Sequence, residues 1–143
     1  MITIKQIAMQ DSLYQEEREL RNKILLRPFG LPDHAWEMKD TRSWHFVALE
    51  NNEVVACVVL CPFENEERAQ LMQMAVDNSL QGKGVGKLLV EALITFCKEQ
   101  GIKEMMCHAR ENAIPFYEKM NFERYDEEFV EVGIKHYKMK ILI

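Results

Sequence analysis

The residues best suited to chemistry in this chain form a glycine-rich stretch near its middle. Gly82, Gly84 and Gly86 occupy alternate positions, Lys83 lies between the first two, and Lys87 follows the third. The stretch follows an apolar, strand-like run and precedes an amphipathic one, so it should form a turn from a strand into a helix. Glycine lets a backbone approach a ligand closely, and the first helical turn offers unpaired N–H donors. We therefore expect an anion-binding loop with a pyrophosphate ligand, the alternative being a tight turn with incidental glycines.

Spacing excludes two common phosphate-binding motifs. A P-loop needs glycine, four residues and then Gly-Lys-Ser/Thr, but counting back from Gly86 reaches Gln81, and Leu88 follows the lysine. A dinucleotide-binding fingerprint that begins at Gly82 would need a third glycine at Lys87, and it would follow the first strand of the domain. Gln-x-x-Gly-x-Gly is the pattern that remains.

That pattern, at Gln81, Gly84 and Gly86, resembles the pyrophosphate loop of the GCN5-related N-acetyltransferase (GNAT) superfamily. A second block, residues 113–122, reads Ala-Ile-Pro-Phe-Tyr-Glu-Lys-Met-Asn-Phe and resembles the Ala-x-x-Phe-Tyr-Glu-Lys-x-Gly-Phe segment of the same superfamily. Two motifs in the expected order are more specific than one. The resemblance extends from about Leu71 to the end of the chain.

The resemblance implies that acetyl-CoA is the cosubstrate and that no metal is required. Backbone amides of the loop would bind the pyrophosphate, and the preceding strand, splayed from its neighbour in family members, would hydrogen-bond the pantetheine arm. Lys83 and Lys87 would add positive charge or remain solvated. The implied cofactor-binding residues are Met74, Ala75, Val76, Gln81, Gly82, Lys83, Gly84, Val85, Gly86, Lys87, Arg110, Asn112 and Phe116.

Two departures from the family pattern leave alternatives open. Many members carry an asparagine seven residues before the motif tyrosine, where this chain has Arg110, while Asn112 lies five residues before it. Either residue is a candidate for contact with the pantetheine, and Asn112 is equally suited to cap the next helix. Asn121 replaces the motif glycine, and asparagine is the next-best residue for a left-handed helix terminus.

The resemblance implies that Tyr117 is the general acid, because a phenol can protonate a thiolate leaving group within hydrogen-bond reach. Its alternative is an aromatic packed on the inner face of a short helix. Histone-type members place a glutamate base where this chain has Gln70, and an amide cannot accept that proton. The remaining candidates for a base are His108, His136, Glu131 and Glu37.

Composition predicts a single domain over residues 1–143, because the chain is long enough for one core. The start of the chain lacks an apolar signal-like region and no segment reaches membrane-spanning length, so we expect a cytoplasmic protein with no membrane partner. A net charge of -5 argues against nucleic-acid binding and favours a cationic or amine-bearing substrate. The cysteines show no metal-binding spacing and should pack in the core.

Hydrophobic periodicity predicts strands, helices and turns in the order of an α+β fold. Strands are expected at residues 1–8, 44–49, 53–62, 68–76, 103–109, from 122 onward and at 136–143, and helices at 12–26, from 87 to 100 and in a short segment after 112. Ser12 and Gln15 suggest a capping box, Pro28 a helix stop, and Asn51-Asn52 a hairpin turn. Residues 31–40 should be irregular and close to the site. The order resembles the GNAT fold, a mostly antiparallel mixed sheet flanked by helices.

The expected function is transfer of an acetyl group from acetyl-CoA to a primary amine of an unidentified small molecule, peptide or protein. A backbone N–H of Met74 or Val76 would polarise the thioester carbonyl. The alternative is a CoA-binding sensor or interaction module with weak catalysis, which the absence of a glutamate at Gln70 favours. An acyl group other than acetyl and a homodimeric state stay open.

Overall fold

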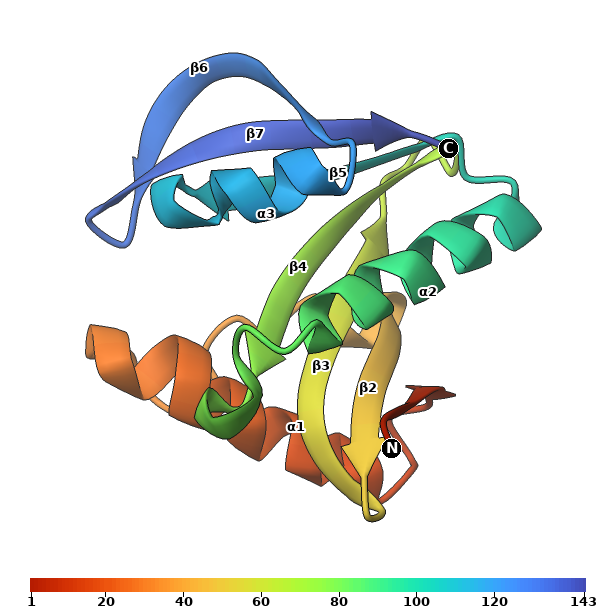
Figure 1. The fold of residues 1–143 in the computed structure, drawn as a ribbon, viewed down its shortest axis with the longest axis vertical. Coiled ribbons are helices and arrows are strands. Elements are labelled where there is room, and N and C mark those ends of the chain that lie inside the picture. The colour runs from red at the N-terminus through yellow and green to blue at the C-terminus, as the bar shows by residue number, and fades with distance from the viewer.

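The computed structural model describes all 143 residues as a seven-stranded sheet with three α-helices (Figure 1). The strand order is β1-β2-β3-β4-β5-β7-β6, and only the β4–β5 pair is parallel. The strands are β1 (Thr3–Ile7), β2 (Trp44–Glu50), β3 (Glu53–Pro62), β4 (Arg68–Val76), β5 (Glu104–Arg110), β6 (Glu123–Glu131) and β7 (Ile134–Leu142), and the helices are α1 (Leu13–Arg21), α2 (Val85–Gln100) and α3 (Ile114–Lys119). The predicted α+β class with a mostly antiparallel mixed sheet is confirmed.

The two faces of the sheet carry separate cores. Helices α2 and α3 pack with one face in a large cluster that includes the fully buried Leu89 and Leu93. Helix α1 packs on the other face through Tyr14 and Leu20, which meet Ala75 of β4. All four cysteines are buried and unpaired, as expected of thiols that pack as small hydrophobic groups.

The centre of the sheet opens because β4 and β5 pair over only part of their length. Their parallel pairing runs from Arg68 to Leu71, while β4 continues to Val76 along β3 alone. A β-bulge interrupts this second half, where Gln73 has a positive φ of 53°. A bulge bends its strand and re-aims side chains. Figure 1 shows β4 turning away from β5 and β7, so that a V-shaped opening forms between them.

The predicted tight turns have the expected backbone geometry. Asn51 and Asn52, between β2 and β3, both have positive φ values, as a two-residue hairpin turn requires. Asn121 follows α3 with φ 71°, the left-handed conformation predicted where family members carry glycine. Gly101 closes α2 in the same conformation, as the sequence indicated.

Helix α1 differs from its prediction at its start and in the helix type of its last turn. The Ser12 side chain makes no capping hydrogen bond, and the Asp11 carboxylate instead accepts one from the Leu13 N–H at 2.9 Å. Beyond Arg21 the chain continues as a π-helix over Asn22–Leu26 and a 3₁₀ turn over Arg27–Phe29. The helix that begins with α1 thus ends at Leu26, before Pro28, as predicted, and Pro28 lies in the first turn of a separate 3₁₀ helix, where proline is tolerated.

Residues 31–40 contain no α-helix or strand, as expected, and they run beside the opening in the sheet. The side-chain carbonyl of Asn22 anchors this segment by accepting a hydrogen bond from the His34 N–H at 2.7 Å. No helix combines the length and apolar character needed to cross a membrane.

Candidate active site

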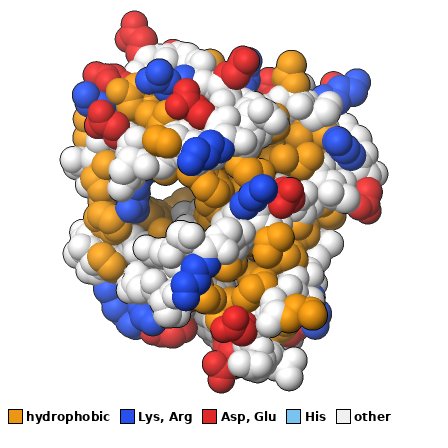
Figure 2. All heavy atoms as spheres, viewed as in Figure 1, with side chains coloured by type: hydrophobic (Ala, Val, Ile, Leu, Met, Phe, Trp, Pro, Cys, Tyr) orange, Lys and Arg blue, Asp and Glu red, His pale blue; other side chains and the backbone are white.

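A cleft of about 1390 Å³ occupies the opening between β4 and β5. Its walls come from the glycine-rich loop, α3, the β6–β7 turn, and residues 22–40, which we call the segment that follows α1. Figure 2 shows the hollow bordered mainly by hydrophobic side chains, with separate Lys or Arg side chains around it. The volume exceeds that of ordinary small-molecule pockets, so the cleft can hold a large cofactor together with a second ligand.

The glycine-rich loop presents free backbone donors to this cleft. Gly82 and Gly84 have φ values of 80° and 84°, a conformation that other residues adopt only with strain. Helical bonding in α2 starts with the Leu88 N–H, which donates to the Gly84 carbonyl at 3.2 Å. The N–H groups of residues 85–87 therefore have no helical acceptor and, together with the helix dipole, form an anion-binding corner.

The absence of a side chain at Gly86 allows close helix packing as well as close approach of a ligand. A Cβ atom at this position would lie 3.4 Å from the ring of Phe116, so the missing side chain lets α3 and α2 come close together. Phe116 also lines the cleft. The loop and the second sequence motif are thus in direct contact.

Side chains before the loop hold it in place. The Gln81 side-chain amide donates to the Val76 carbonyl at 3.0 Å and to the Asn78 side chain at 3.1 Å. Asp77 accepts a hydrogen bond from the Ser79 N–H at 3.0 Å, and this bond, with help from the nearby Lys23 ammonium, lowers the pKa of Asp77 to about 2. The Gln81 amide therefore braces the loop from within.

Most of the predicted cofactor-binding residues line the cleft: Met74, Val76, Gln81, Gly82, Gly84, Val85, Gly86, Lys87, Arg110, Asn112 and Phe116. The side chains of Ala75 and Lys83 do not. Ala75 packs into the core under α1, because the β-bulge turns it to that face. Asn112 is not the N-cap of α3, a place that Ala113 takes, so its capping interpretation is wrong.

Tyr117 lines the cleft and is buried between aromatic rings. Its ring packs edge-on against Phe116 and Phe122, with centroids 5.0 and 5.2 Å away. Burial, with a smaller contribution from the neighbouring Cys107, raises the pKa of the Tyr117 hydroxyl well above its usual value. The phenol therefore holds its proton at neutral pH, as a general acid must before it acts.

The side chains of β5 separate the two faces of the cleft. Met105, Cys107 and Ala109 pack into the core under α2 and α3, so the alternating residues His108 and Arg110 point to the opposite face. The Arg110 guanidinium lies over the ring of Phe29, 4.1 Å from its centroid. Burial lowers the pKa of Arg110, although Glu131 partly offsets this effect. Tyr117 and Arg110 thus serve different sides of the cleft.

Three of the four candidate bases meet on this second face. A carboxylate oxygen of Glu131 lies 3.3 Å from Nδ1 of His108, and the other lies 3.9 Å from Nε2 of His136. His136 Nδ1 donates to the Ile134 carbonyl at 2.8 Å, so its Nε2 is the nitrogen free to exchange a proton. The fourth candidate, Glu37, lies outside the cleft lining, where it binds Arg18 and His34.

Charge in the cleft is opposite in sign to the net charge of the chain. The cationic lining residues are Lys23, Lys39, Lys87, Arg110 and Lys119, whereas Glu131 is the single carboxylate. The net charge of -5 is therefore no guide to the ligand, because the acidic residues lie elsewhere on the surface. Clefts lined by one sign of charge attract ligands of the other sign.

Sequence reasoning missed Gln73, which lies at the β-bulge in the cleft wall. Its side-chain carbonyl oxygen is shielded from solvent and has no hydrogen-bond partner in the protein. A buried polar atom without a partner costs free energy, so a ligand N–H is a suitable partner for it. A local sequence pattern does not mark this residue, because the bulge depends on how β3 and β4 pair.

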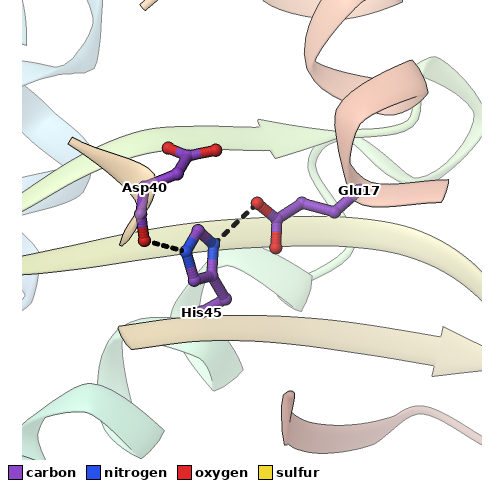
Figure 3. Close-up of side chains that lie close together, drawn as sticks. All are labelled: Glu17, Asp40 and His45. Carbon is purple, nitrogen blue, oxygen red and sulfur yellow. Dashed lines mark hydrogen bonds and ion pairs between the residues drawn. The ribbon is translucent and has the colours of Figure 1, made fainter. Parts of the chain in front are cut away.

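A buried polar network beneath the segment that follows α1 was also not predicted. Figure 3 shows His45 between Glu17 of α1 and the backbone of Asp40, with 2.9 Å hydrogen bonds from its two ring nitrogens. Arg21 bonds to Glu17 at 2.9 Å and to Asp40 at 2.8 Å. The Tyr14 hydroxyl donates to Asp40. The network ties α1, β2 and the end of the 31–40 segment together.

The hydrogen bonds of the two ring nitrogens favour a positively charged His45. Its Nε2 must donate, because a carbonyl only accepts, and its Nδ1 then shares one further proton with the Glu17 carboxylate. Burial lowers the pKa of His45, but the hydrogen bond and charge of Glu17 outweigh it, so the pKa is raised. The Arg21 guanidinium lies among the oxygens that could have held a metal ion, and its charge makes this trio unsuitable for a cation.

Comparison with solved structures defines the class of fold. An acyl-CoA N-acyltransferase of Pseudomonas aeruginosa matches with a TM-score of 0.86 and 16% identity, covering 98% of this chain and 99% of that one. A GNAT family acetyltransferase of Elizabethkingia anophelis with acetyl-CoA bound matches with a TM-score of 0.74 and 22% identity, covering 99% and 95%. The fold is therefore that of acyl-CoA N-acyltransferases.

The family follows from the sequence comparison. The family model described as an acetyltransferase (GNAT) domain matches residues 29–143, and the protein belongs to this family of acyltransferases. A Bacillus subtilis (strain 168) protein described as an acetyltransferase is 37% identical over 70 residues, covering 49% of this chain and 48% of the relative. The chain spans about half the length of the curated relatives it matches.

Proposed function

We propose that this protein transfers an acetyl group from acetyl-CoA to a primary amine in a ternary complex. The observation that carries the proposal is that one cleft is lined both by the α2 start, with its free N–H groups, and by the buried Tyr117. A pyrophosphate needs the first feature, and a departing thiolate needs the second. Acetyl-CoA is bound in the E. anophelis acetyltransferase, which has the same fold.

The cofactor would enter along the glycine-rich loop. Backbone amides of the loop, above all those of residues 85–87, would bind its pyrophosphate, and the Lys87 side chain would add charge from the cleft wall. The pantetheine arm would lie along β4 at Met74 and Val76, in the part of the strand that β5 leaves unpaired. Asn112 and Phe116 would contact the arm from α3 and the turn before it. The side chains of Ala75 and Lys83 have no role in this arrangement, and no step needs a metal.

The chemistry consists of one bond exchange and two proton transfers. The uncharged amine attacks the thioester carbonyl, whose oxygen would be polarised by a backbone N–H of Met74 or Val76 in the bulged strand. As the tetrahedral intermediate collapses, the carbon–sulfur bond breaks and Tyr117 donates its proton to the CoA thiolate. Holding both reactants in one cleft would supply much of the rate.

Glu131 is our proposed acceptor of the amine proton. It is the only carboxylate in the cleft lining, and His108 and His136 lie close enough to pass its proton onward. Its side chain is 45% exposed, so the proton can leave to solvent. This cluster would supply the base that is missing at Gln70, which also lines the cleft.

Calorimetric titration with acetyl-CoA tests the proposal at its first step. Wild-type protein should bind saturably, and Lys87→Glu should weaken binding at least tenfold, because a negative charge would then face the pyrophosphate. Lys98→Glu reverses an exposed charge at the far end of α2 and serves as the control. An absence of binding at millimolar acetyl-CoA would contradict the proposal.

Release of free CoA thiol on addition of amines then separates the enzyme from the alternative. A CoA-binding sensor or interaction module would bind acetyl-CoA without turnover on any amine. Activity with longer acyl-CoA substrates would show whether the acyl group is acetyl. Four further points stay predictions. They are a single domain over residues 1–143, a cytoplasmic location, the absence of a nucleic-acid or membrane partner, and a possible homodimer.

A further inference from the structure

We propose that the acceptor is an amine that also carries a carboxylate, and that Arg110 binds this carboxylate on the face of the cleft opposite Tyr117. The inference rests on the proposed acetyl transfer and names the class of its second substrate. It also decides between Arg110 and Asn112, because it assigns Arg110 to the acceptor and leaves the pantetheine to Asn112.

Arg110 differs from the other arginines of the chain in lacking an anionic partner while being half-buried. Carboxylates pair with each of Arg18, Arg21, Arg27 and Arg68. Arg42 and Arg124 also lack a carboxylate partner, but they are exposed, so water solvates their charge. Removing a guanidinium from water without pairing it is unfavourable, and an anionic ligand would offset that cost.

The surroundings of Arg110 hold its guanidinium ready for a planar anion. The ring of Phe29 covers one face of the group at 4.1 Å, and Pro28 precedes this ring in a rigid 3₁₀ turn. Stacking occupies the face and leaves the N–H edges free, because no protein atom accepts a hydrogen bond from them. A guanidinium with free edges binds a carboxylate through two parallel hydrogen bonds.

The cofactor does not account for this cation. The alternation along β5 turns Arg110 away from Cys107 and Tyr117, toward the segment that follows α1. The pyrophosphate donors lie at the start of α2, on the other side of the sheet opening. Lys39, a half-buried cleft residue of the segment that follows α1, also lacks an ion-pair partner. The second face therefore offers its own positive charge.

The same face carries the one carboxylate of the cleft. Glu131 lies near enough to Arg110 to influence its pKa, yet the two form no salt bridge. A ligand with an ammonium group toward Glu131 and a carboxylate toward Arg110 would match both charges. A simple cationic amine would leave the arginine unpaired, and a simple carboxylic acid would have no nitrogen to acetylate.

The experiment compares matched acceptors in wild-type and Arg110→Gln proteins. The panel holds amino acids of different chain length, among them glycine, β-alanine, γ-aminobutyrate and several α-amino acids, each beside its carboxamide. The amide has a different amine pKa, so the informative quantity is the ratio of kcat/KM for acid over amide. We expect this ratio to fall 10- to 100-fold in Arg110→Gln, mainly through KM, which is the range for loss of a charge-assisted hydrogen bond. Arg110→Lys should recover only part of it, and Arg124→Gln should match the wild type.

Two further readouts make the result decisive. Calorimetric titration with acetyl-CoA should give similar dissociation constants for wild type and Arg110→Gln, whereas a tenfold loss would assign Arg110 to the cofactor and overturn the inference. Equal loss of activity on acids and amides would overturn it as well. If acetyl-CoA binds but no amine in the panel reacts, titration of the CoA complex with the N-acetylated acids and amides decides. Tighter binding of the acids than of the amides in wild type, lost in Arg110→Gln, supports the inference. Equal binding of acids and amides in wild type overturns it.

Discussion

The two halves of the cleft are built in different ways. The half that we assign to the cofactor comes from the end of β4, the loop, α2 and α3, which all lie within residues 74–119 and present mainly backbone groups. The half that we assign to the acceptor combines Phe29, Arg110 and Glu131, which come from three distant parts of the chain. The first can be recognised as a motif, whereas the second exists only after folding.

This difference agrees with the chemistry each half would perform. A cosubstrate of constant structure can be bound by backbone N–H groups and helix geometry, which depend little on side-chain identity. An acceptor must be distinguished from other amines, and charged side chains on separate elements provide that distinction. The buried network of Glu17, Arg21, Asp40 and His45 anchors α1 and the segment before β2, and that segment lines the acceptor half. Substitutions in the two halves should therefore have separable effects.

Tyr117→Phe should produce the largest effect, a loss of turnover of between about 10²- and 10⁴-fold. The hydroxyl is the proposed proton donor to CoA thiolate, and the ring alone can preserve packing against Phe116 and Phe122. Steady-state CoA release measures kcat, and calorimetry should show nearly unchanged acetyl-CoA affinity. Tyr137→Phe is the matched control, because that hydroxyl bonds to Glu128 on the surface. Equal turnover in Tyr117→Phe and wild type would remove Tyr117 from the mechanism.

Arg21→Met should lower the free energy of unfolding by about 3–5 kcal/mol, because it leaves two buried carboxylates without their cation. Urea unfolding measures the loss. Arg18→Met removes a partly exposed ion pair with Glu37 and should cost less than about 1 kcal/mol. In the folded fraction, acceptor KM should rise more than the dissociation constant of acetyl-CoA. The opposite pattern would show that the two halves are not separable.

Glu131→Gln should reduce kcat/KM about 100-fold at neutral pH, since the amide cannot take the amine proton. The deficit should shrink as pH rises toward the pKa of the acceptor amine, because more of the acceptor then arrives as the free amine and hydroxide can take the proton that is lost after attack. Glu128→Gln alters the same strand but not the cleft and serves as the control. A deficit that stays constant with pH would indicate a binding role for Glu131 instead.

His45 should give the smallest effect, a pH dependence of stability. Because its pKa is raised in the folded state, its contribution is complete below the unfolded value near about 6.5 and is lost as pH rises through the folded pKa. The free energy of unfolding of the wild type should therefore decrease over that window relative to His45→Gln. His34→Gln removes an exposed histidine and should behave like the wild type. A parallel pH profile for His45→Gln and wild type would contradict the charged network.

Local patterns were sufficient for much of the fold. The β4 strand, the Asn51-Asn52 turn and the glycine at the end of α2 occur where the sequence predicted them, because alternation, positive φ and helix termination are local properties. The capping box at Ser12 and the cap at Asn112 were wrong, since a neighbouring carboxylate and an added 3₁₀ turn took those places. The helix end at Leu26, before Pro28, was predicted, but the change of its last turn to a π-helix was not.

The sequence alone determined the family motifs and the order of the elements. It also singled out the loop as a candidate pyrophosphate site and Tyr117 as a candidate general acid, because each depends on residues close together in the chain. Tertiary structure decided that the cleft is cationic in an acidic protein, that Glu131 rather than Glu37 lies with the cleft histidines, and that Gln73 lacks a partner. These features arise from the bulge in β4 and from strands paired across long separations. Side-chain direction there depends on register and packing, which no local pattern specifies.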